Sequence, residues 1–252
     1  MRKPLIAGNW KMHKTINEAV ELVSALKREL FDFNQADIVV CPPFTALDNV
    51  HEIIMDTNIK LGAQNLFYQK QGAFTGEVSP AMIKDCGCEY AIIGHSERRK
   101  YFGETDTMVN KRIQVALEEG FTPIFCVGET LEERENNKTI EVIDIQLKGG
   151  LENMKEEDIL KIVIAYEPVW AIGTGKTATP RQAEEVHMFI RKWIEEHYSS
   201  SCASMLRILY GGSVKAENIK DLMKQENIDG ALVGGASLNA DAFVSIVKNS
   251  SN

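Results

Sequence analysis

Cysteine is scarce in this 252-residue chain and is not arranged for metal or redox chemistry. The five cysteines stand at positions 41, 86, 88, 126 and 202, and no two of them form a CxxC pair. Structural zinc sites and thioredoxin-like motifs need closely paired cysteines, and an odd count does not suit a disulfide framework. We therefore expect reduced, mostly buried thiols and no metal site.

Long apolar runs are also missing. No stretch approaches the roughly 18 apolar residues that a bilayer-spanning helix needs. The N-terminal sequence MRKPLIAGNW reaches the polar residues Asn9 and Lys11 too early for the apolar region of a secretory signal. We expect a cytoplasmic protein that has no membrane partner.

Positive charge is in deficit. The formal net charge is −8, and no basic stripe stands out from the scattered charges. Such a chain is a poor match for the phosphate backbone of nucleic acids, so we expect no nucleic-acid partner. An anionic ligand must instead be held locally, by a few lysines or by backbone N–H groups at helix starts.

Short apolar runs repeat along the whole chain, and segments with helical periodicity separate them. The runs lie at 4–9, 36–41, 59–64, 89–94, 121–127, 160–166, 206–210 and 229–234. Continuously apolar strands that alternate with helices indicate a parallel sheet covered on its faces. Eight units in about 250 residues predict an α/β protein with a closed (β/α)8 barrel, forming one domain over residues 1–252. An open doubly wound sheet is the alternative, but no glycine-rich turn directly follows the first run.

Several local signals refine this prediction. Capping boxes at Thr15, Thr130 and Thr179 mark helix starts, as do Pro80 and Pro180 in first-turn positions. Pro123 lies inside the fifth run, so we expect regular pairing of that strand to begin at about Ile124. In the segment 16–30 one helical face is predicted to be apolar, and it consists of Ile16, Ala19, Val20, Val23, Leu26 and Leu30.

Polar residues and glycines follow the apolar runs, where a parallel barrel places its chemistry. In chain order they are Asn9, Lys11, His95, Glu167, Gly211, Gly212, Ser213, Gly234 and Gly235. Each one alone has an ordinary structural explanation: a solvated lysine, a hydrogen-bonded histidine, a surface carboxylate or a turn glycine. Their shared position at the ends of strands makes them candidates for one site.

His95 and Glu167 have the most telling surroundings. The residues after His95, SERR, start a helix whose N–H groups favour a neutral imidazole. Glu167 is held between an apolar strand and the rigid Pro168, which is a sensible place for a general base. The glycines after the last two strands let backbone N–H groups approach a phosphate.

The stretch AIGTGKTATP (171–180) imitates two nucleotide motifs. A P-loop would need glycine where Trp170 stands, and a dinucleotide fingerprint should follow its strand directly. A bulky apolar middle, a stiff start and small flanking residues instead indicate a lid that excludes water. The predicted lid comprises Pro168, Val169, Trp170, Ala171, Ile172, Gly173, Thr174, Gly175 and Lys176.

Seven segments together resemble the triosephosphate isomerase family, whose fold is the (β/α)8 (TIM) barrel. They are GNWKMH (8–13), AQNLF (63–67) with GAFTGEVS (72–79), IIGHSERR (92–99), CVGETLEERE (126–135), AYEPVWAIGTGKTATP (165–180), LYGGSV (209–214) and DGALVGGASL (229–238). The resemblance implies interconversion of dihydroxyacetone phosphate and D-glyceraldehyde 3-phosphate without a metal or cofactor, in glycolysis and gluconeogenesis.

The resemblance also implies a role for each site residue. Glu167 is the implied base, His95 a neutral electrophile, Lys11 the balancing charge and Asn9 a donor to the carbonyl oxygen. The implied phosphate ligands are Gly173, Ser213, Gly234 and Gly235.

The same resemblance implies a homodimer, in which the long segment 65–79 enters the partner and Thr75 and Glu97 lie in the contact. Two alternatives stay open at this point. One is a phosphate-binding barrel without catalysis, and the other is a related barrel that acts on a larger sugar phosphate.

Overall fold

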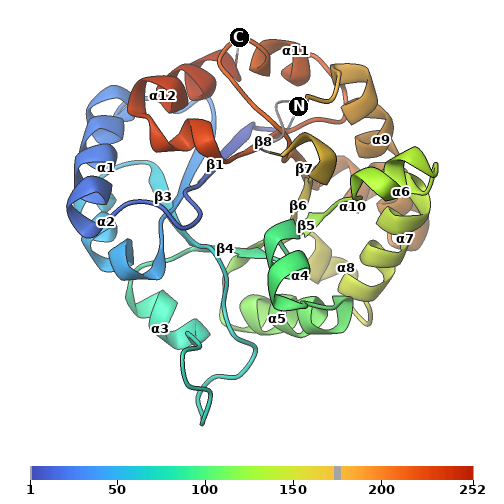
Figure 1. The fold of residues 1–252 in the computed structure, drawn as a ribbon, viewed down its shortest axis with the longest axis horizontal. Helices are drawn as coiled ribbons and strands as arrows, with labels where there is room; N and C mark the ends of the chain where they lie inside the picture. Colours follow the sequence, from blue (N-terminus) through green and yellow to red (C-terminus); the bar gives the residue numbers. More distant parts are fainter. Residues whose placement is uncertain (1, 173–176, 252) are drawn as a thin grey trace.

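The computed structural model describes residues 2–172 and 177–251, and within them eight parallel strands form a closed barrel (Figure 1). Each strand pairs with the next in the sequence, and β8 returns to β1 through the register Leu5↔Gly230 to Gly8↔Val233. The strands are β1 (Leu5–Asn9), β2 (Asp37–Cys41), β3 (Ile59–Ala63), β4 (Tyr90–Ile93), β5 (Thr122–Val127), β6 (Val163–Tyr166), β7 (Arg207–Tyr210) and β8 (Gly230–Val233). The predicted (β/α)8 barrel is confirmed.

Helices surround the barrel on its outside (Figure 1). The α-helices are α1 (Ile16–Leu30), α2 (Leu47–Ile54), α3 (Pro80–Asp85), α4 (Ser96–Phe102), α5 (Asp106–Glu118), α6 (Leu131–Glu135), α7 (Thr139–Gly150), α8 (Glu156–Ile159), α9 (Pro180–His197), α10 (Ser200–Met205), α11 (Ile219–Met223) and α12 (Ala240–Asn249). Short 3-10 helices form at η1 (Phe44–Ala46), η2 (Val169–Ala171) and η3 (Gly235–Leu238).

The capping predictions are confirmed. Capping boxes at Thr15, Thr130 and Thr179 start α1, α6 and α9. Pro80 and Pro180 open their helices, and the side chain of Ser79 accepts a hydrogen bond from the backbone N–H of Met82. These caps fix where each helix leaves the carboxyl end of the barrel.

Two local predictions need correction. Pairing of β5 begins before Ile124, because Thr122 and Pro123 already pair with β4. Alternate residues face opposite neighbours, so the missing N–H of Pro123 falls on the β6 side, where pairing begins only at Ile124↔Val163.

On α1, the predicted apolar face was only partly right. Ile16 is 43% exposed and Val20 is half-buried, whereas Leu22 is buried. The helix packs against α2 and α12 as well as the barrel, so neighbouring helices decide which side chains are covered.

Side chains inside the barrel alternate with side chains that face the helices, as the two-residue period of a strand requires. On β1, Leu5 and Ala7 point into the barrel cluster, and Ile6 belongs to the layer between barrel and helices. Because the barrel interior is filled by side chains, its chemistry lies at the strand ends.

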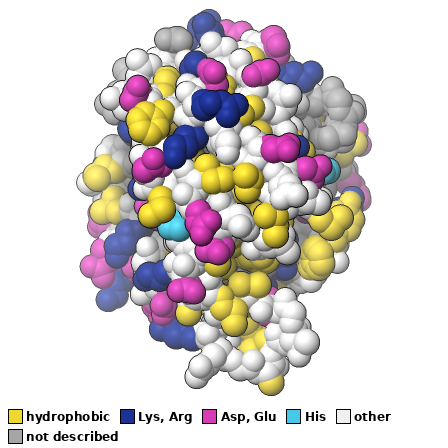
Figure 2. All heavy atoms as spheres, turned by 90° about the vertical axis from the view of Figure 1, so that its left-hand side faces the viewer, with side chains coloured by type: hydrophobic (Ala, Val, Ile, Leu, Met, Phe, Trp, Pro, Cys, Tyr) yellow, Lys and Arg dark blue, Asp and Glu magenta, His cyan; other side chains and the backbone are white. Residues whose placement is uncertain are grey.

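The segment 65–79 between β3 and α3 projects away from the barrel (Figure 1). Residues 69–77 are all exposed, and the ring of Phe74 packs only against Phe67, at 4.7 Å between centroids, among the ring contacts of the described residues. Figure 2 shows hydrophobic side chains gathered near this projection. The segment therefore presents apolar surface that its own barrel does not cover.

Candidate active site

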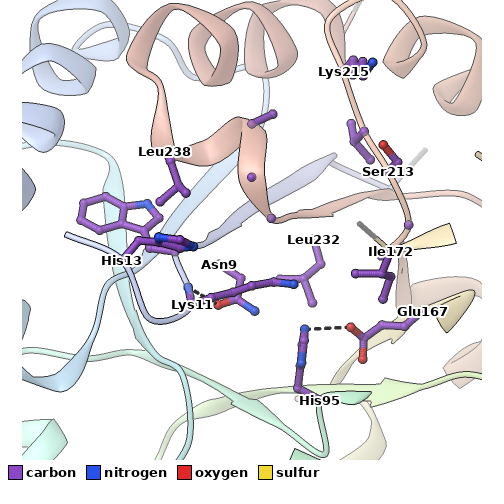
Figure 3. A pocket seen from close by; sticks show the side chains of 17 residues that line it. Asn9, Lys11, His13, His95, Glu167, Ile172, Ser213, Lys215, Leu232 and Leu238 are labelled. Carbon is purple, nitrogen blue, oxygen red and sulfur yellow. Dashed lines mark hydrogen bonds and ion pairs between the residues drawn. The ribbon is translucent and has the colours of Figure 1, made fainter. Parts of the chain in front are cut away.

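The strand-end residues surround one cavity of about 390 Å³ at the carboxyl end of the barrel (Figure 3). It is lined by Asn9, Trp10, Lys11, His13, His95, Glu167, Ile172, Gly211, Gly212, Ser213, Val214, Lys215, Leu232, Gly234, Gly235, Ala236 and Leu238. Residues from β1, β4, β6, β7 and β8, far apart in the sequence, thus share one site.

Glu167 directly follows β6 and is only 1% exposed. Its backbone N–H donates to Val127 O at 2.7 Å, which ties the residue to the end of β5. One carboxylate oxygen accepts a hydrogen bond from the Ser96 backbone N–H at 2.9 Å, and the other lies 2.9 Å from His95 Nε2 (Figure 3). A weaker contact from Ser96 Oγ, at 3.4 Å, completes this shell.

The protonation of Glu167 follows from these contacts. Burial raises the pKa of Glu167. The neighbouring His95, the Ser96 N–H and the charge of Lys11 together lower it by more than burial raises it, so the net pKa is below the ordinary value. The carboxyl group is therefore ionised at neutral pH and ready to accept a proton.

His95 lies two residues after the end of β4 and is the N-cap of α4. The Glu97 backbone N–H donates to His95 Nδ1 at 3.2 Å, so this nitrogen is an acceptor and Nε2 carries the proton that points to Glu167. This hydrogen bond suits the neutral ring that the sequence predicts, but the net pKa of His95 in this structure is raised, which favours the charged ring.

The carboxylate works in the opposite direction. Burial lowers the pKa of His95, but Glu167 and then Glu97 raise it more, so in this arrangement the net pKa lies above the ordinary value.

Lys11 has a left-handed backbone, with φ of 52°, just after β1. Its backbone N–H donates to Asn9 Oδ1 at 3.0 Å, and Gln64 Nε2 donates to its carbonyl oxygen at 2.8 Å. Its Nζ lies 2.6 Å from a carboxylate oxygen of Glu97. The cation is therefore held across the cavity floor between Asn9 and His95 (Figure 3).

A further wall of the cavity is built from the loops after β7 and β8, and its first residue, Gly211, lies beside Glu167. Ser213 faces the cavity, and η3 starts at Gly235 with Gly234 as its N-cap (Figure 3). A Cβ added to Gly235 would meet no heavy atom within 4 Å, so its backbone is open to a ligand. Lys215 and His13 also line the cavity, which sequence reasoning did not predict.

The predicted lid is described only over residues 168–172. Trp170 Nε1 donates to the buried carboxylate of Glu129 at 2.9 Å, and Tyr166 OH donates to the same oxygen at 3.1 Å. Ile172 reaches the cavity. Gly173, Thr174, Gly175 and Lys176, including the predicted phosphate ligand Gly173, lie outside the described residues.

The predicted dimer residues fall in different places. Thr75 is exposed on the projecting segment, away from the cavity. Glu97 is half-buried beside the cavity, where its carboxylate pairs with Lys11.

Ser96 and Gln64 are supporting residues that sequence reasoning missed. Ser96 follows His95 directly, so its neighbour in the sequence was the available signal. Gln64 carried no such signal, because its contact with Lys11 joins the segments that follow two different strands.

Metal-binding clusters and membrane-spanning helices are both absent from the described part of the chain. Residues 2–172 and 177–251 contain no group of three or more His, Cys, Asp or Glu side chains placed to hold a metal ion. None of the helices over the same ranges is long and apolar enough to cross a membrane.

Fold and cavity together define the class of protein: a barrel enzyme in which a buried carboxylate, a histidine and a lysine face an open, glycine-rich wall. Comparison with known proteins gives the particular family. The model of the family described as triosephosphate isomerase matches residues 4–250. The chain therefore belongs to the triosephosphate isomerase family.

Individual relatives agree over their full lengths. The chain is 59% identical to the triosephosphate isomerase of Endomicrobium trichonymphae and 56% identical to that of Carboxydothermus hydrogenoformans, each over 99% of this chain and 100% of the relative. It is 55% identical to the triosephosphate isomerase of Geotalea uraniireducens, over 98% of this chain and 99% of the relative.

Proposed function

We propose that Glu167, His95, Lys11 and Asn9 interconvert dihydroxyacetone phosphate and D-glyceraldehyde 3-phosphate through an enediolate. Membership in the family makes the protein an aldose–ketose isomerase of triose phosphate, with its place in glycolysis and gluconeogenesis. The observation that carries the residue assignment is the contact of 2.9 Å between Glu167 and His95 on the cavity floor, with Lys11 and Asn9 beside them.

Glu167 acts as the base. It removes the proton from the carbon next to the carbonyl group and returns it to the neighbouring carbon. To do so its carboxylate must leave Ser96 and turn into the cavity. Its lowered pKa supports this role, because the group must be ionised to accept a proton.

His95 and the polar floor stabilise the charge that forms on the substrate oxygens. The Nε2–H that now points to Glu167 would donate to these oxygens after the carboxylate moves. Asn9 donates to the carbonyl oxygen, and Lys11 balances the negative charge. A positioned base contributes only about 10²- to 10⁴-fold, so these donors must supply much of the remaining barrier reduction.

The phosphate group binds at Ser213, Gly234 and Gly235, on the loops after β7 and β8. The start of η3 offers backbone N–H groups there, and its dipole favours an anion. Gly173, from the lid, is a further proposed ligand. The reaction proposed here requires no metal or cofactor.

Residues 168–176 are the proposed lid. Trp170 and Glu129 form its anchor, and Ile172 is the apolar side chain that covers the cavity. Excluding water strengthens each charge interaction in the site and protects the enediolate from losing its phosphate.

The active form is proposed to be a homodimer, with Thr75 and Glu97 near the contact. Large apolar side chains are exposed after β1, on the projecting segment 65–79 and on α4, at Met12, Phe74, Tyr101 and Phe102. Burial of such surface between two copies would stabilise the pair. Sedimentation at assay concentration tests this, and a fully active monomer would contradict it.

We also propose that the protein works in the cytoplasm. Its five cysteines are all unpaired thiols, which suits a reducing compartment. Localisation of a tagged full-length protein checks this proposal.

A coupled assay that starts from dihydroxyacetone phosphate tests the function. Formation of D-glyceraldehyde 3-phosphate is expected from the wild-type protein and not from a Glu167→Gln variant, which keeps the size of the side chain but has no base. Binding without turnover in both proteins would favour a phosphate-binding barrel. Turnover of larger sugar phosphates at comparable kcat/KM would favour the other alternative, although a cavity of about 390 Å³ fits a small substrate.

A further inference from the structure

We propose that Gln146, on the outer helix α7, is a positioning residue for the catalytic base Glu167. This inference rests on the proposed role of Glu167. Gln146 does not line the active-site cavity, so it acts through other residues.

The side-chain amide of Gln146 clamps both polar backbone groups of Gly128. The Gly128 N–H donates to Gln146 Oε1 at 2.8 Å, and Gln146 Nε2 donates to Gly128 O at 3.1 Å. An amide side chain offers a donor and an acceptor side by side at every ordinary pH, and asparagine is shorter by one methylene. The contact therefore suits glutamine at this position.

Gly128 in turn lies directly against Glu167. A Cβ on Gly128 would be 1.8 Å from the carbonyl oxygen of Glu167, so the two backbones lie too close together for any side chain at position 128. Hydrogen bonds flank this contact on both sides, from Glu167 N to Val127 O at 2.7 Å and from Val169 N to Glu129 O at 3.1 Å. The backbone of Glu167 thus packs against the backbone of Gly128, which is hydrogen-bonded to Gln146.

The clamp acts where the barrel ladder has ended. β5 stops at Val127 and β6 stops at Tyr166, so Gly128 and Glu167 are the first residues beyond the strands. Helix α7 packs outside β5 and is anchored by the fully buried Ile143 and Leu147 (Figure 1). Gln146 therefore links a rigid outer helix to the loop under the base.

The test begins with Gln146→Met, which keeps the side-chain length and removes both hydrogen bonds. A misplacement of about 1 Å costs on the order of 10²-fold, so a smaller shift should lower kcat about 10-fold. The KM should stay within about twofold, because the proposed phosphate ligands lie on the loops after β7 and β8, whereas the bonds of Gln146 go to Gly128 after β5.

Gln146→Glu supplies a readout that a purely structural role would not move. An ionised carboxylate accepts from the Gly128 N–H but repels Gly128 O, whereas the protonated carboxyl group both accepts and donates as glutamine does. The kcat of this variant relative to wild type at the same pH should therefore rise as the pH falls.

Two control variants separate positioning from stability. Ile143→Val weakens the anchoring of the same helix and leaves the clamp in place. Gln114→Met makes the same chemical change on α5, where Gln114 donates to Asn110 Oδ1. Both should retain wild-type kcat.

The outcomes are distinct. A wild-type kcat in Gln146→Met, a rise in KM without a fall in kcat, or a pH-independent ratio for Gln146→Glu would each overturn the inference. An equal loss of kcat in Ile143→Val at matched stability would also overturn it. Absence of turnover in the wild-type protein would instead refute the proposed function.

Discussion

Gly128→Ala tests how tightly the base is held by the loop beneath it. The new Cβ would lie 1.8 Å from the Glu167 carbonyl oxygen, whereas real Cβ atoms keep at least 3.0 Å from such atoms. The two backbone segments must therefore separate by about 1.2 Å. The Cβ position is fixed by the backbone of residue 128 and the oxygen belongs to the backbone of Glu167, so no side-chain rotation can relieve the clash.

The expected loss follows from this displacement. A shift of about 1 Å at a reacting group costs on the order of 10²-fold in rate, which corresponds to about 2.7 kcal/mol in the activation barrier. Overpacking should also lower the free energy of unfolding by about 1 to 3 kcal/mol. We expect the fall in kcat to exceed what partial unfolding explains, with KM nearly unchanged.

The assay pairs steady-state kinetics with urea unfolding, and Gly62→Ala is the matched control. Its Cβ would lie 2.7 Å from Cys41 Sγ, so the substitution overpacks the barrel without touching Glu167. Gly62→Ala should lose stability and keep its kcat. If Gly128→Ala retains wild-type kcat while fully folded, the base does not depend on this contact.

Three further predictions concern the base, the fold and the assembly. Glu167→Asp withdraws the carboxylate by one methylene, so kcat should fall about 10²-fold while the phosphate affinity stays similar. The control Glu184→Asp lies outside the cavity and should change neither quantity. Normal turnover in Glu167→Asp would remove Glu167 from its role. His187 is fully buried, and burial lowers its pKa to about 3. Below about pH 6.5 the unfolded chain takes up a proton on this histidine and the folded protein does not. The free energy of unfolding should therefore decrease as the pH is lowered, by about 2 kcal/mol at pH 5. Urea unfolding of His187→Leu should show a flatter dependence, and an equally steep one would contradict this assignment. Thr75→Arg should weaken the proposed dimer and make specific activity fall on dilution, whereas concentration-independent activity would speak against that contact.

Much of the fold could be predicted because local chemistry and global architecture agree. Apolar runs separated by capped, amphipathic helices allow few arrangements other than a parallel barrel, and the eight strands lie within the predicted runs. The predictions of local detail failed where contacts with neighbouring strands and helices determine pairing and burial. Pro123 is tolerated because its missing N–H faces a position before β6 begins, and Ile16 is exposed although it continues an apolar pattern.

The candidate site was predictable to a similar depth. Asn9, Lys11, His95 and Glu167 follow strands, and a parallel barrel brings the carboxyl ends of its strands to one rim. The contacts between them could not be predicted, because no pattern in the sequence relates Glu167 to Ser96 or Lys11 to Gln64. The opposed influences on the pKa of His95 are likewise invisible without the distance to Glu167.

The sequence by itself determined the strands, the helix caps, the family and the residue types at the strand ends, because these depend on neighbours along the chain. Only the tertiary structure decided that the backbone of Gly128 supports Glu167 and that Gln146 holds Gly128 from an outer helix. Those contacts join three separate segments, and displacements of an ångström or less change their energies. Barrel closure sets these distances, and no local pattern encodes them.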